Sequence, residues 1–434
     1  MKRIVKYLAT SSSHPGTATL KNTATSLFFL CVLFTTSPLN AGTHPPGDDG
    51  LLVGSGRLHA FVEAESHYVY NPHRASLDAA ADIRETKGPM LAIRPGLNYK
   101  ALSSIVEIQL QSLADLRYYT ADYLAGNNNF FGNDTRLGLL LNKDSTLPLR
   151  ISAGYLRSDV PANQTISRSL LNRTLSLGLD GEWKPGGGAF TVRFKAPASK
   201  ISYDAEENAN HEKLNNLRVQ PSLRVAWKFF PKTAFTLDLF SDLTQYEEGS
   251  YSKDIDFFGG SLGLTGAITS RISAVIRAGF STPILASDLA SSASGFVGLF
   301  ELGYKLSNAL SVSLATGREM RATPLFNYHK DIFGSLAASL NIGSQVNINL
   351  NFEARTLTFG TPTTSETTGF AGRNDLAVKP NLIISYFANN WLTISLHNRY
   401  EYRDTGDFTI SMLSGEATGS YNYYDTFLRI SARY

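Results

Sequence analysis

The ten residues Val346–Arg355 read VNINLNFEAR, and this stretch decides the fold. Its apolar and polar side chains alternate without a break. Successive side chains of a β-strand point to opposite sides of the sheet, so the alternation predicts a strand with one apolar and one polar face. The polar face carries asparagine, glutamate and arginine, whereas the apolar face carries no charge.

The same alternation recurs from residue 56 to the C-terminus. It is clearest in residues 106–118, 217–229 and 392–403. Similar runs begin near fourteen other residues: Leu58, Met90, Thr135, Leu147, Thr174, Ala189, Thr233, Asp254, Arg271, Gly295, Ala309, Ile332, Asp375 and Tyr423. The sequence therefore predicts an all-β protein of about eighteen antiparallel strands.

Short and long connections alternate between these runs. Short turns are predicted at residues 101–104, 142–146, 184–188, 231–233, 269–270, 305–308, 343–344 and 388–390. Long polar connections are predicted at residues 71–88, 120–133, 159–171, 199–214, 358–373 and 406–421. This arrangement is typical of a transmembrane up-and-down β-barrel with short periplasmic turns and long extracellular loops.

Composition narrows the class of protein. The net charge is only +3, without a long basic run, so nucleic acid is not expected as a partner. A single cysteine excludes a disulfide scaffold. Beyond the N-terminus the chain has no apolar segment of the ~20 residues that a membrane-spanning helix needs. A soluble all-β protein and a membrane barrel remain.

Three features favour the barrel in lipid. The apolar faces are nearly free of charge over the ~9–11 residues that a tilted strand needs to cross the hydrocarbon. Aromatic residues gather at the ends of the runs, as Tyr118, Trp183, Trp227 and Trp391 do, where interfacial girdles lie. We therefore expect outer-membrane lipid as the surroundings, in a Gram-negative bacterium.

The end of the chain supplies the third feature. It is an alternating strand that closes on an aromatic residue, and Phe427, Ile430 and Tyr434 are its key positions. Such endings look like the C-terminal signal that the barrel assembly machinery reads. We expect that machinery to be a partner.

The N-terminus predicts export. Residues 1–41 combine early lysines and an arginine, an apolar core at residues 26–34 and a small-residue exit at Ala41, which is typical of a signal peptide. An alternative is that the segment is retained as an anchor. Residues 42–55 form a periplasmic lead-in, and residues 56–434 form the barrel.

Closure of the barrel is required because hydrocarbon offers the backbone no hydrogen-bond partner. The strand near Leu58 must therefore pair with the strand near Tyr424. Pro148, Pro221 and Pro380 fall inside candidate strands, where each removes a donor from the hydrogen-bond ladder. We expect local bulges there.

A barrel of this width leaves an aqueous lumen unless a plug fills it, and the lead-in is too short for a plug domain. Charged residues of both signs fall on the predicted inner face. The candidate pore-lining residues are Glu107, Asp115, Arg117, Arg136, Arg218, Arg224, Arg271, Arg277, Glu353, Arg355, Arg399, Glu401 and Arg429. They either filter solutes by size and charge or simply pair with one another and hold water.

An enzymatic barrel is the rival class. The eight histidines share no motif spacing with serine or aspartate. His59, Glu63, Glu65 and His67 lie on one face of the first strand, but they are spread too far along it to hold one metal ion. We therefore expect no catalytic residues, no cofactor and no metal.

The sequence also resembles a known family. The stretch Arg117-Tyr118-Tyr119 before the asparagine-rich residues 127–133, the run GGSLGL at residues 259–264 and the run YEYRD at residues 400–404 are similar to segments of the outer-membrane β-barrel porin family associated with exopolysaccharide gene clusters. The resemblance implies a barrel of this size that acts in polysaccharide secretion or as a porin. It also implies periplasmic polysaccharide export components as partners.

Together these observations predict an outer-membrane porin-like barrel that conducts hydrophilic solutes and serves exopolysaccharide secretion. Two alternatives stay open. One is a general diffusion porin unrelated to polysaccharide, and the other is a surface barrel with an adhesive or enzymatic role.

Overall fold

The computed structural model describes residues 50–72, 74, 87–120, 129–160, 170–203, 214–247, 254–285, 294–323, 327–360, 374–405 and 420–434. The predicted signal peptide, most of the lead-in and the central parts of the predicted long connections lie outside these residues. Within them, no helix has the length and apolar character of a membrane-spanning segment.

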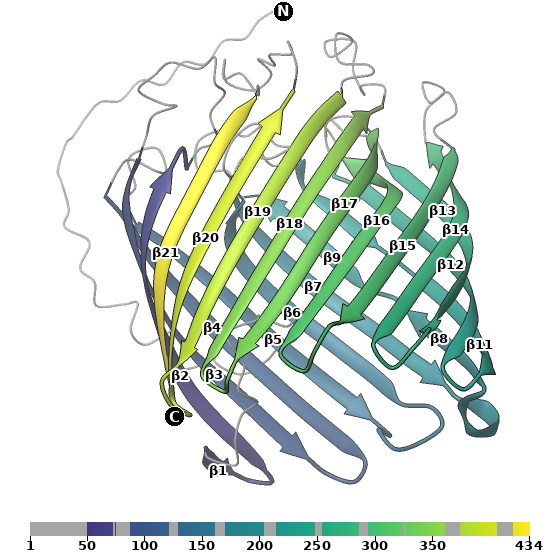
Figure 1. Ribbon diagram of the computed structural model, residues 1–434, viewed down its shortest axis with the longest axis horizontal. Coiled ribbons are helices and arrows are strands. Elements are labelled where there is room, and N and C mark those ends of the chain that lie inside the picture. Colours follow the sequence, from purple (N-terminus) through teal and green to yellow (C-terminus); the bar gives the residue numbers. More distant parts are fainter. Residues whose placement is uncertain are drawn as a thin grey trace, which may run out of the picture.

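The described chain is almost entirely strand (Figure 1). The strands are β1 (Leu51–Val53), β2 (Gly56–Tyr70), β3 (Lys87–Leu102), β4 (Val106–Tyr119), β5 (Asn129–Leu141), β6 (Leu149–Val160), β7 (Leu170–Trp183), β8 (Phe190–Lys195), β9 (Ala198–Tyr203), β10 (Asn216–Val219), β11 (Ser222–Phe230), β12 (Thr233–Tyr246), β13 (Ile255–Ala267), β14 (Ile272–Leu285), β15 (Gly295–Lys305), β16 (Leu310–Thr323), β17 (Asn327–Ile342), β18 (Val346–Phe359), β19 (Asn374–Phe387), β20 (Leu392–Asp404) and β21 (Tyr421–Arg433). A 3₁₀ turn, η1 (Pro185–Gly188), connects β7 to β8.

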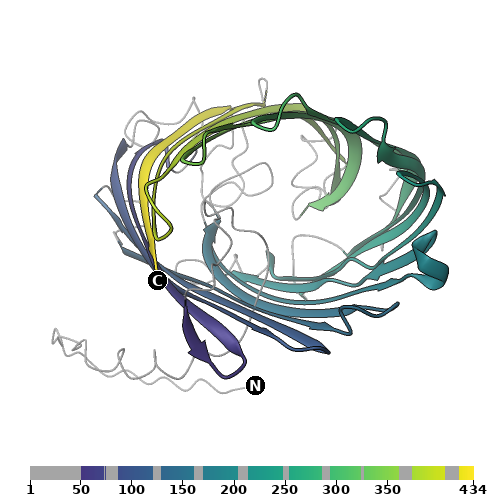
Figure 2. The same ribbon diagram turned by 60° about the horizontal axis from the view of Figure 1, so that its bottom comes forward.

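These strands form a closed antiparallel barrel of eighteen strands within the described residues, which confirms the predicted fold class (Figure 2). Two strands of the barrel are each interrupted once, so that each consists of two labelled segments. β8 continues into β9 across Ala196 and Pro197, and β10 continues into β11 across Gln220 and Pro221. β1 is a short extension that pairs only with β2.

The barrel closes where the first long strand meets the last. β2 and β21 pair antiparallel from Phe61 opposite Arg433 to Tyr70 opposite Tyr424. The backbone N–H of Tyr434 extends this ladder by donating to the carbonyl oxygen of Ala60 at 2.9 Å. We call this junction, with the neighbouring strands β3, β4, β19 and β20, the closure seam. It confirms the pairing that the sequence required.

The prolines interrupt the ladder without adding a residue, so the expected bulges at the three predicted positions are wrong. In β19 the register against β20 passes from Val378 opposite Tyr402 to Asn381 opposite Arg399, so Pro380 has no partner on β20, although it still lies opposite Phe352 of β18. The spacing is equal on both strands. Pro148 lies just before β6, and Pro221 lies in the gap between β10 and β11. Because proline lacks an N–H, the ladder loses a bond while the register is kept.

The outer surface of the barrel is apolar. On β7, for example, Leu175 and Leu177 are 57% and 66% exposed, although they lie in the middle of a strand. Trp183, Trp227 and Trp391 are also exposed and lie at the short-turn ends of their strands or in the adjoining turn. An exposed apolar band bordered by aromatic rings is stable in lipid and costly in water.

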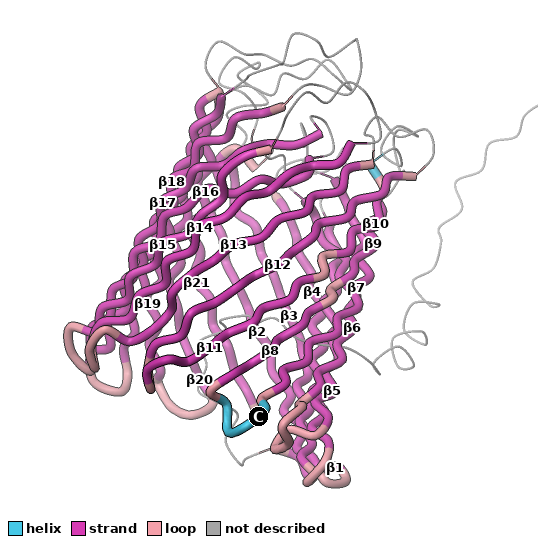
Figure 3. Tube along the Cα trace, turned by 90° about the vertical axis from the view of Figure 1, so that its right-hand side faces the viewer, coloured by secondary structure: helices cyan, strands magenta, loops and turns pink. Residues whose placement is uncertain are grey.

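The short turns lie together at one rim, where β1 and the C-terminus are also found (Figure 1). Figure 3 shows the strands tilted as they rise from this rim. Closure of a sheet into a barrel requires such a tilt. The positions of the short turns agree with the sequence prediction.

Leu110 on β4 tests the assignment of the lipid-facing side. Its register partners, Tyr99 and Leu137, lie on the same outer face. We expect Leu110→Arg to cost about 2–4 kcal/mol in the free energy of unfolding, because a charge near the bilayer midplane loses its hydration. Urea titration of the barrel in lipid vesicles measures this cost.

The neighbouring Gln111→Arg is the matched control, because residue 111 faces the inside of the barrel. It should change the free energy of unfolding much less. Equal stability of Leu110→Arg and the unchanged protein would contradict the orientation of β4.

Candidate functional site

The inner wall of the barrel carries the charged residues that the sequence singled out. Twelve of the thirteen candidates lie in described strands, and Arg271 lies in the turn between β13 and β14. On β4, Asp115 and Arg117 lie on the face opposite the exposed Leu116 and Tyr118. That these residues line a conduction path stays a prediction. The structure shows which of them are held by partners and which are more open.

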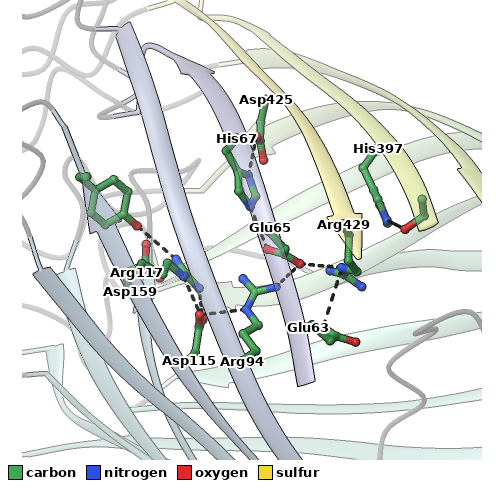
Figure 4. Close-up of polar contacts among 12 residues, drawn as sticks. Glu63, Glu65, His67, Arg94, Asp115, Arg117, Asp159, His397, Asp425 and Arg429 are labelled. Carbon is green, nitrogen blue, oxygen red and sulfur yellow. Dashed lines mark hydrogen bonds and ion pairs between the residues drawn. The ribbon is translucent and has the colours of Figure 1, made fainter. Parts of the chain in front are cut away.

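A buried ionic cluster fills the inner face of the closure seam (Figure 4). Its centre is Glu65 of β2, whose side chain is 0% exposed. Oε1 of Glu65 accepts hydrogen bonds from Nε of Arg429 at 2.6 Å and from Nη1 of Arg94 at 2.5 Å. One carboxylate thus joins the last strand of the barrel to β2 and β3. Arg429 also lies 3.8 Å from Glu63.

The cluster continues along β3, β4 and β6. Nε of Arg94 donates to Asp115 at 2.9 Å, and Arg117 donates to the other oxygen of Asp115 at 2.6 Å. Arg117 also donates to Asp159 at 2.7 Å. Arg117 therefore lies between two carboxylates, and its charge is neutralised locally. We call Glu63, Glu65, Arg94, Asp115, Arg117, Asp159 and Arg429 the seam cluster.

Two histidines and a phenylalanine form a stack beside this cluster. Each ring nitrogen of His67 faces a carboxylate oxygen, Glu65 at 2.8 Å and Asp425 at 2.9 Å. The Phe427 ring lies between the rings of His67 and His397, with centroid distances of 4.1 and 4.3 Å. The stack holds β2, β20 and β21 together from the inside.

Other candidate residues are also held by opposite charges. Glu401 lies 3.1 Å from Arg74 and 3.0 Å from Lys379, and it accepts a hydrogen bond from the hydroxyl of Tyr421. Arg403 and Asp375 form a fully buried pair next to it. Burial without such pairing would be costly, so each buried charge in this group is held by an opposite charge.

A third group lies on β16, β17 and β18. Arg355 donates to Asp331 at 2.5 Å and to Glu319 at 2.6 Å, and its Nε lies 3.3 Å from Glu353. His329 pairs with Asp331. Three carboxylates around one guanidinium leave this part of the wall neutral to acidic.

The wall formed by β7, β8, β11, β12 and β14 differs. A cavity of about 370 Å³ is lined there by the charged residues Arg193, Lys195, Arg224, Asp238 and Arg277, and by Arg318 and Glu319 of β16. Arg193 donates two hydrogen bonds to Asp180, at 2.9 and 2.6 Å, and Arg224 pairs with Asp238. We call Arg193, Lys195, Arg224, Arg277, Asp238 and Asp180 the basic pocket; Asp180 does not line the cavity itself but pairs with Arg193.

Four of the remaining candidates lie apart from these groups, whereas Arg399 lies beside the histidine stack. Glu107 pairs with the half-exposed Lys100 at 3.2 Å near the short-turn rim. Arg136 pairs with Asp134, and Arg218 pairs with Asp242. Arg271 lines a second cavity of about 410 Å³ near the same rim. The guanidinium of Arg399 lies 5.0 Å from the Phe427 ring centroid.

The candidate residues named from the sequence omit several members of these groups. Arg94, Asp331, Asp375, Arg403 and Asp425 were missed, although they hold the predicted residues in place. Arg94 follows the alternation of β3, but Pro89 and Pro95 in the same strand obscure it. Asp331, Asp375 and Asp425 lie near the long-loop ends of their strands, where the alternation is hard to separate from a polar loop. Arg403 lies on the polar face of the clearly alternating residues 392–403, but its partner Asp375 is 28 residues away in the sequence.

The structure also bears on the enzymatic alternative. Ser395 and His397 are hydrogen-bonded at 3.0 Å, but both are buried. In the described part of the chain, Nδ1 of His397 has no hydrogen-bond partner, so no acid supports this pair as a triad requires. Nor do the described residues include a group of three or more side chains arranged to hold a metal ion.

The three residues of the predicted C-terminal signal point in different directions. Phe427 faces inward in the histidine stack and is 1% exposed. Ile430 and Tyr434 are exposed on the outside. Recognition of this end by the assembly machinery stays a prediction, and Phe427 has a structural role in the folded barrel as well.

No protein-family model and no curated protein sequence matches this chain. Among solved structures, it is similar to OccAB4 of Acinetobacter baumannii, with 10% identity and a TM-score of 0.46 over 87% of this chain and 98% of that one. OpdQ of Pseudomonas aeruginosa gives 12% identity and a TM-score of 0.44 over 87% and 98%. A variant of the ferric enterobactin receptor PfeA of P. aeruginosa gives 7% identity and 0.49 over 87% and 80%. These values are too low to transfer a solute or an activity.

The outer surface of the barrel indicates that the protein is surrounded by lipid. The eighteen described strands satisfy one another's backbone groups in a closed ring, and large apolar side chains cover the outside. Lipid accepts only closed barrels among β-structures, and barrels of this kind belong to outer membranes. The protein therefore has the fold and the surface of an outer-membrane β-barrel.

Arg429 tests the contribution of the seam cluster to stability. We expect Arg429→Met to lower the free energy of unfolding by roughly 2–3 kcal/mol, because Glu65 stays buried with one partner fewer. Urea titration in lipid vesicles measures the change. Arg321→Met is the control, since Arg321 is half-exposed and Glu319 keeps Arg355; it should cost no more than about 1 kcal/mol. Equal effects of the two variants would contradict a special role of the seam.

Proposed function

We propose that the protein is a water-filled conduit for hydrophilic solutes across the outer membrane. The observation that carries the proposal is the charged inner wall, with cavities of about 370 and 410 Å³ next to half-exposed lysine and arginine side chains. Half-exposed charges need water beside them. Barrels of 16–18 strands are wide enough to hold an aqueous channel.

Planar-bilayer recording of the purified barrel tests this proposal. We expect stepwise conductance that scales with salt concentration, because ions pass through bulk-like water. Proteoliposomes should swell in isotonic arabinose faster than in a large neutral oligosaccharide, since the lumen limits solute size. A folded barrel that is silent in bilayers and impermeable to arabinose would contradict a conduit and favour a scaffold role.

We further propose that the conduit serves exopolysaccharide secretion. The support is the resemblance of residues 117–133, 259–264 and 400–404 to the porin family associated with exopolysaccharide gene clusters. A glycan chain is hydrophilic and extended, so a polar lumen suits its passage. Its periplasmic partners would be the polysaccharide export components that the resemblance implies.

Deletion of the gene in its own bacterium separates secretion from general diffusion. If the barrel secretes polysaccharide, deletion should lower surface polysaccharide and leave polymer in the periplasm, and the unchanged gene should restore both. Unaltered surface polysaccharide together with slower uptake of small sugars would contradict the secretion role and support a general diffusion porin.

A further inference from the structure

The basic pocket has more positive than negative side chains. Arg193, Lys195, Arg224 and Arg277 share two carboxylates, Asp180 and Asp238. The four cationic side chains are 43%, 47%, 39% and 25% exposed, respectively. Asp238 is 13% exposed and Asp180 is 27% exposed, so both are more buried than Arg193, Lys195 and Arg224. Positive charge therefore faces the lumen, while the negative charge lies behind it.

Pairing within the pocket is incomplete. Arg193 and Arg224 lie directly opposite each other on β8 and β11, and like charges in such a pair repel. Asp238 pairs with Arg224, but its second oxygen lies 3.7 Å from Nε of Arg277, which is too long for a hydrogen bond. Among the described residues, neither of these two atoms has another hydrogen-bond partner.

Other acidic residues near the basic pocket do not cancel its excess of positive charge. Glu319 is held by Arg321 and Arg355 at 2.7 and 2.6 Å, and Glu182 by Lys184 at 2.8 Å. Glu301 lies on β15 opposite Val275, so one further carboxylate faces this wall. With Glu301 included, the four cations still outnumber the three acids that are not held elsewhere.

The closure seam shows the contrast. Arg94, Arg117 and Arg429 are only 14–18% exposed, and each contacts at least two carboxylates. A solute in the lumen meets little net charge there. The arginines of the basic pocket are the more exposed ones, and Asp238 is shared between two of them.

The pocket also has room for a ligand. Its volume of about 370 Å³ lies within the range of small-molecule sites, which begins near 300 Å³. Gly263 allows close packing beside Arg277, because a Cβ there would lie 2.6 Å from the backbone oxygen of Ile276 and 2.7 Å from Cγ of Arg277. A larger residue at position 263 would force β14 and the arginine side chain to shift.

We propose that the basic pocket binds the oxyanion group, a carboxylate or a phosphate, of a hydrophilic solute. Arg224 and Arg277 supply planar guanidinium donors, and Lys195 adds a point charge at the edge. This inference rests on the proposed conduit and names the class of solute that it favours: sugars that carry an acidic group over neutral sugars.

Block of the single-barrel current tests the inference. D-glucuronate and glucose 6-phosphate are the charged probes, and D-glucose is the neutral probe. We expect both charged probes to interrupt the current at concentrations at which glucose does not. A preference for one of them identifies the carboxylate or the phosphate as the better-fitting group.

Variants that are expected to change the block in opposite directions make the test specific to the basic pocket. Arg224→Gln with Arg277→Gln should weaken block by glucuronate about tenfold or more, because two charged donors are lost. Asp238→Asn should strengthen block, because both arginines lose their shared carboxylate. Arg136→Gln is the matched control, since Arg136 pairs with Asp134 away from the pocket; it should change block less than about twofold.

Titration calorimetry on the folded barrel in detergent micelles measures the binding of glucuronate directly. It compares the unchanged protein, the pocket variants and Arg136→Gln without depending on ion conduction. Conductance without selective binding of the acidic sugars, or equal effects of the pocket variants and Arg136→Gln, would overturn the inference and leave the conduit intact. A silent barrel that still binds glucuronate through the pocket would overturn the conduit alone. Migration of unheated and heated samples in gels confirms that each variant is folded.

Discussion

Every backbone N–H and C=O group in a lipid bilayer must find a partner within the protein, and this constraint governs the whole structure. A flat sheet would leave two unpaired edges in hydrocarbon. The chain removes both edges by pairing β2 with β21, so eighteen described strands form one closed ring. Prolines 95 and 380 lie inside barrel strands and interrupt the ladder locally, but the register is kept on either side.

The closure seam carries the most buried charge, and there is a physical reason for that position. The two strands that meet there come from opposite ends of the chain, and no turn between them fixes their register. Side chains alternate along a strand, so a slip of one residue would move Glu65 or Arg429 to the lipid side. Buried ion pairs add little net stability, but such a misplaced charge would cost several kcal/mol. The seam cluster and the histidine stack thus favour a single closure.

The same alternating pattern produces two walls that differ electrically. At the seam, three guanidinium groups are buried against four carboxylates, so no positive charge is left over. Around β8, β11 and β14, the cationic side chains remain partly exposed and outnumber the carboxylates near them. A lumen with one wall that has no excess positive charge and one positive wall exerts a field across the path of a solute. The arrangement supports a conduit that distinguishes solutes by charge as well as by size.

The sequence by itself determined the strand number, the lipid-facing side and the rim of short turns, because the period of two and the turn residues are local properties. It also placed charge of both signs inside. Only the tertiary structure decided which charges are neutralised: Arg429 finds Glu65 across 364 residues, and Arg403 finds Asp375 on a neighbouring strand. Such pairs depend on register and barrel closure, which local alternation does not encode. Phe427 shows the same limit, since its place between two histidines depends on three strands meeting at the seam.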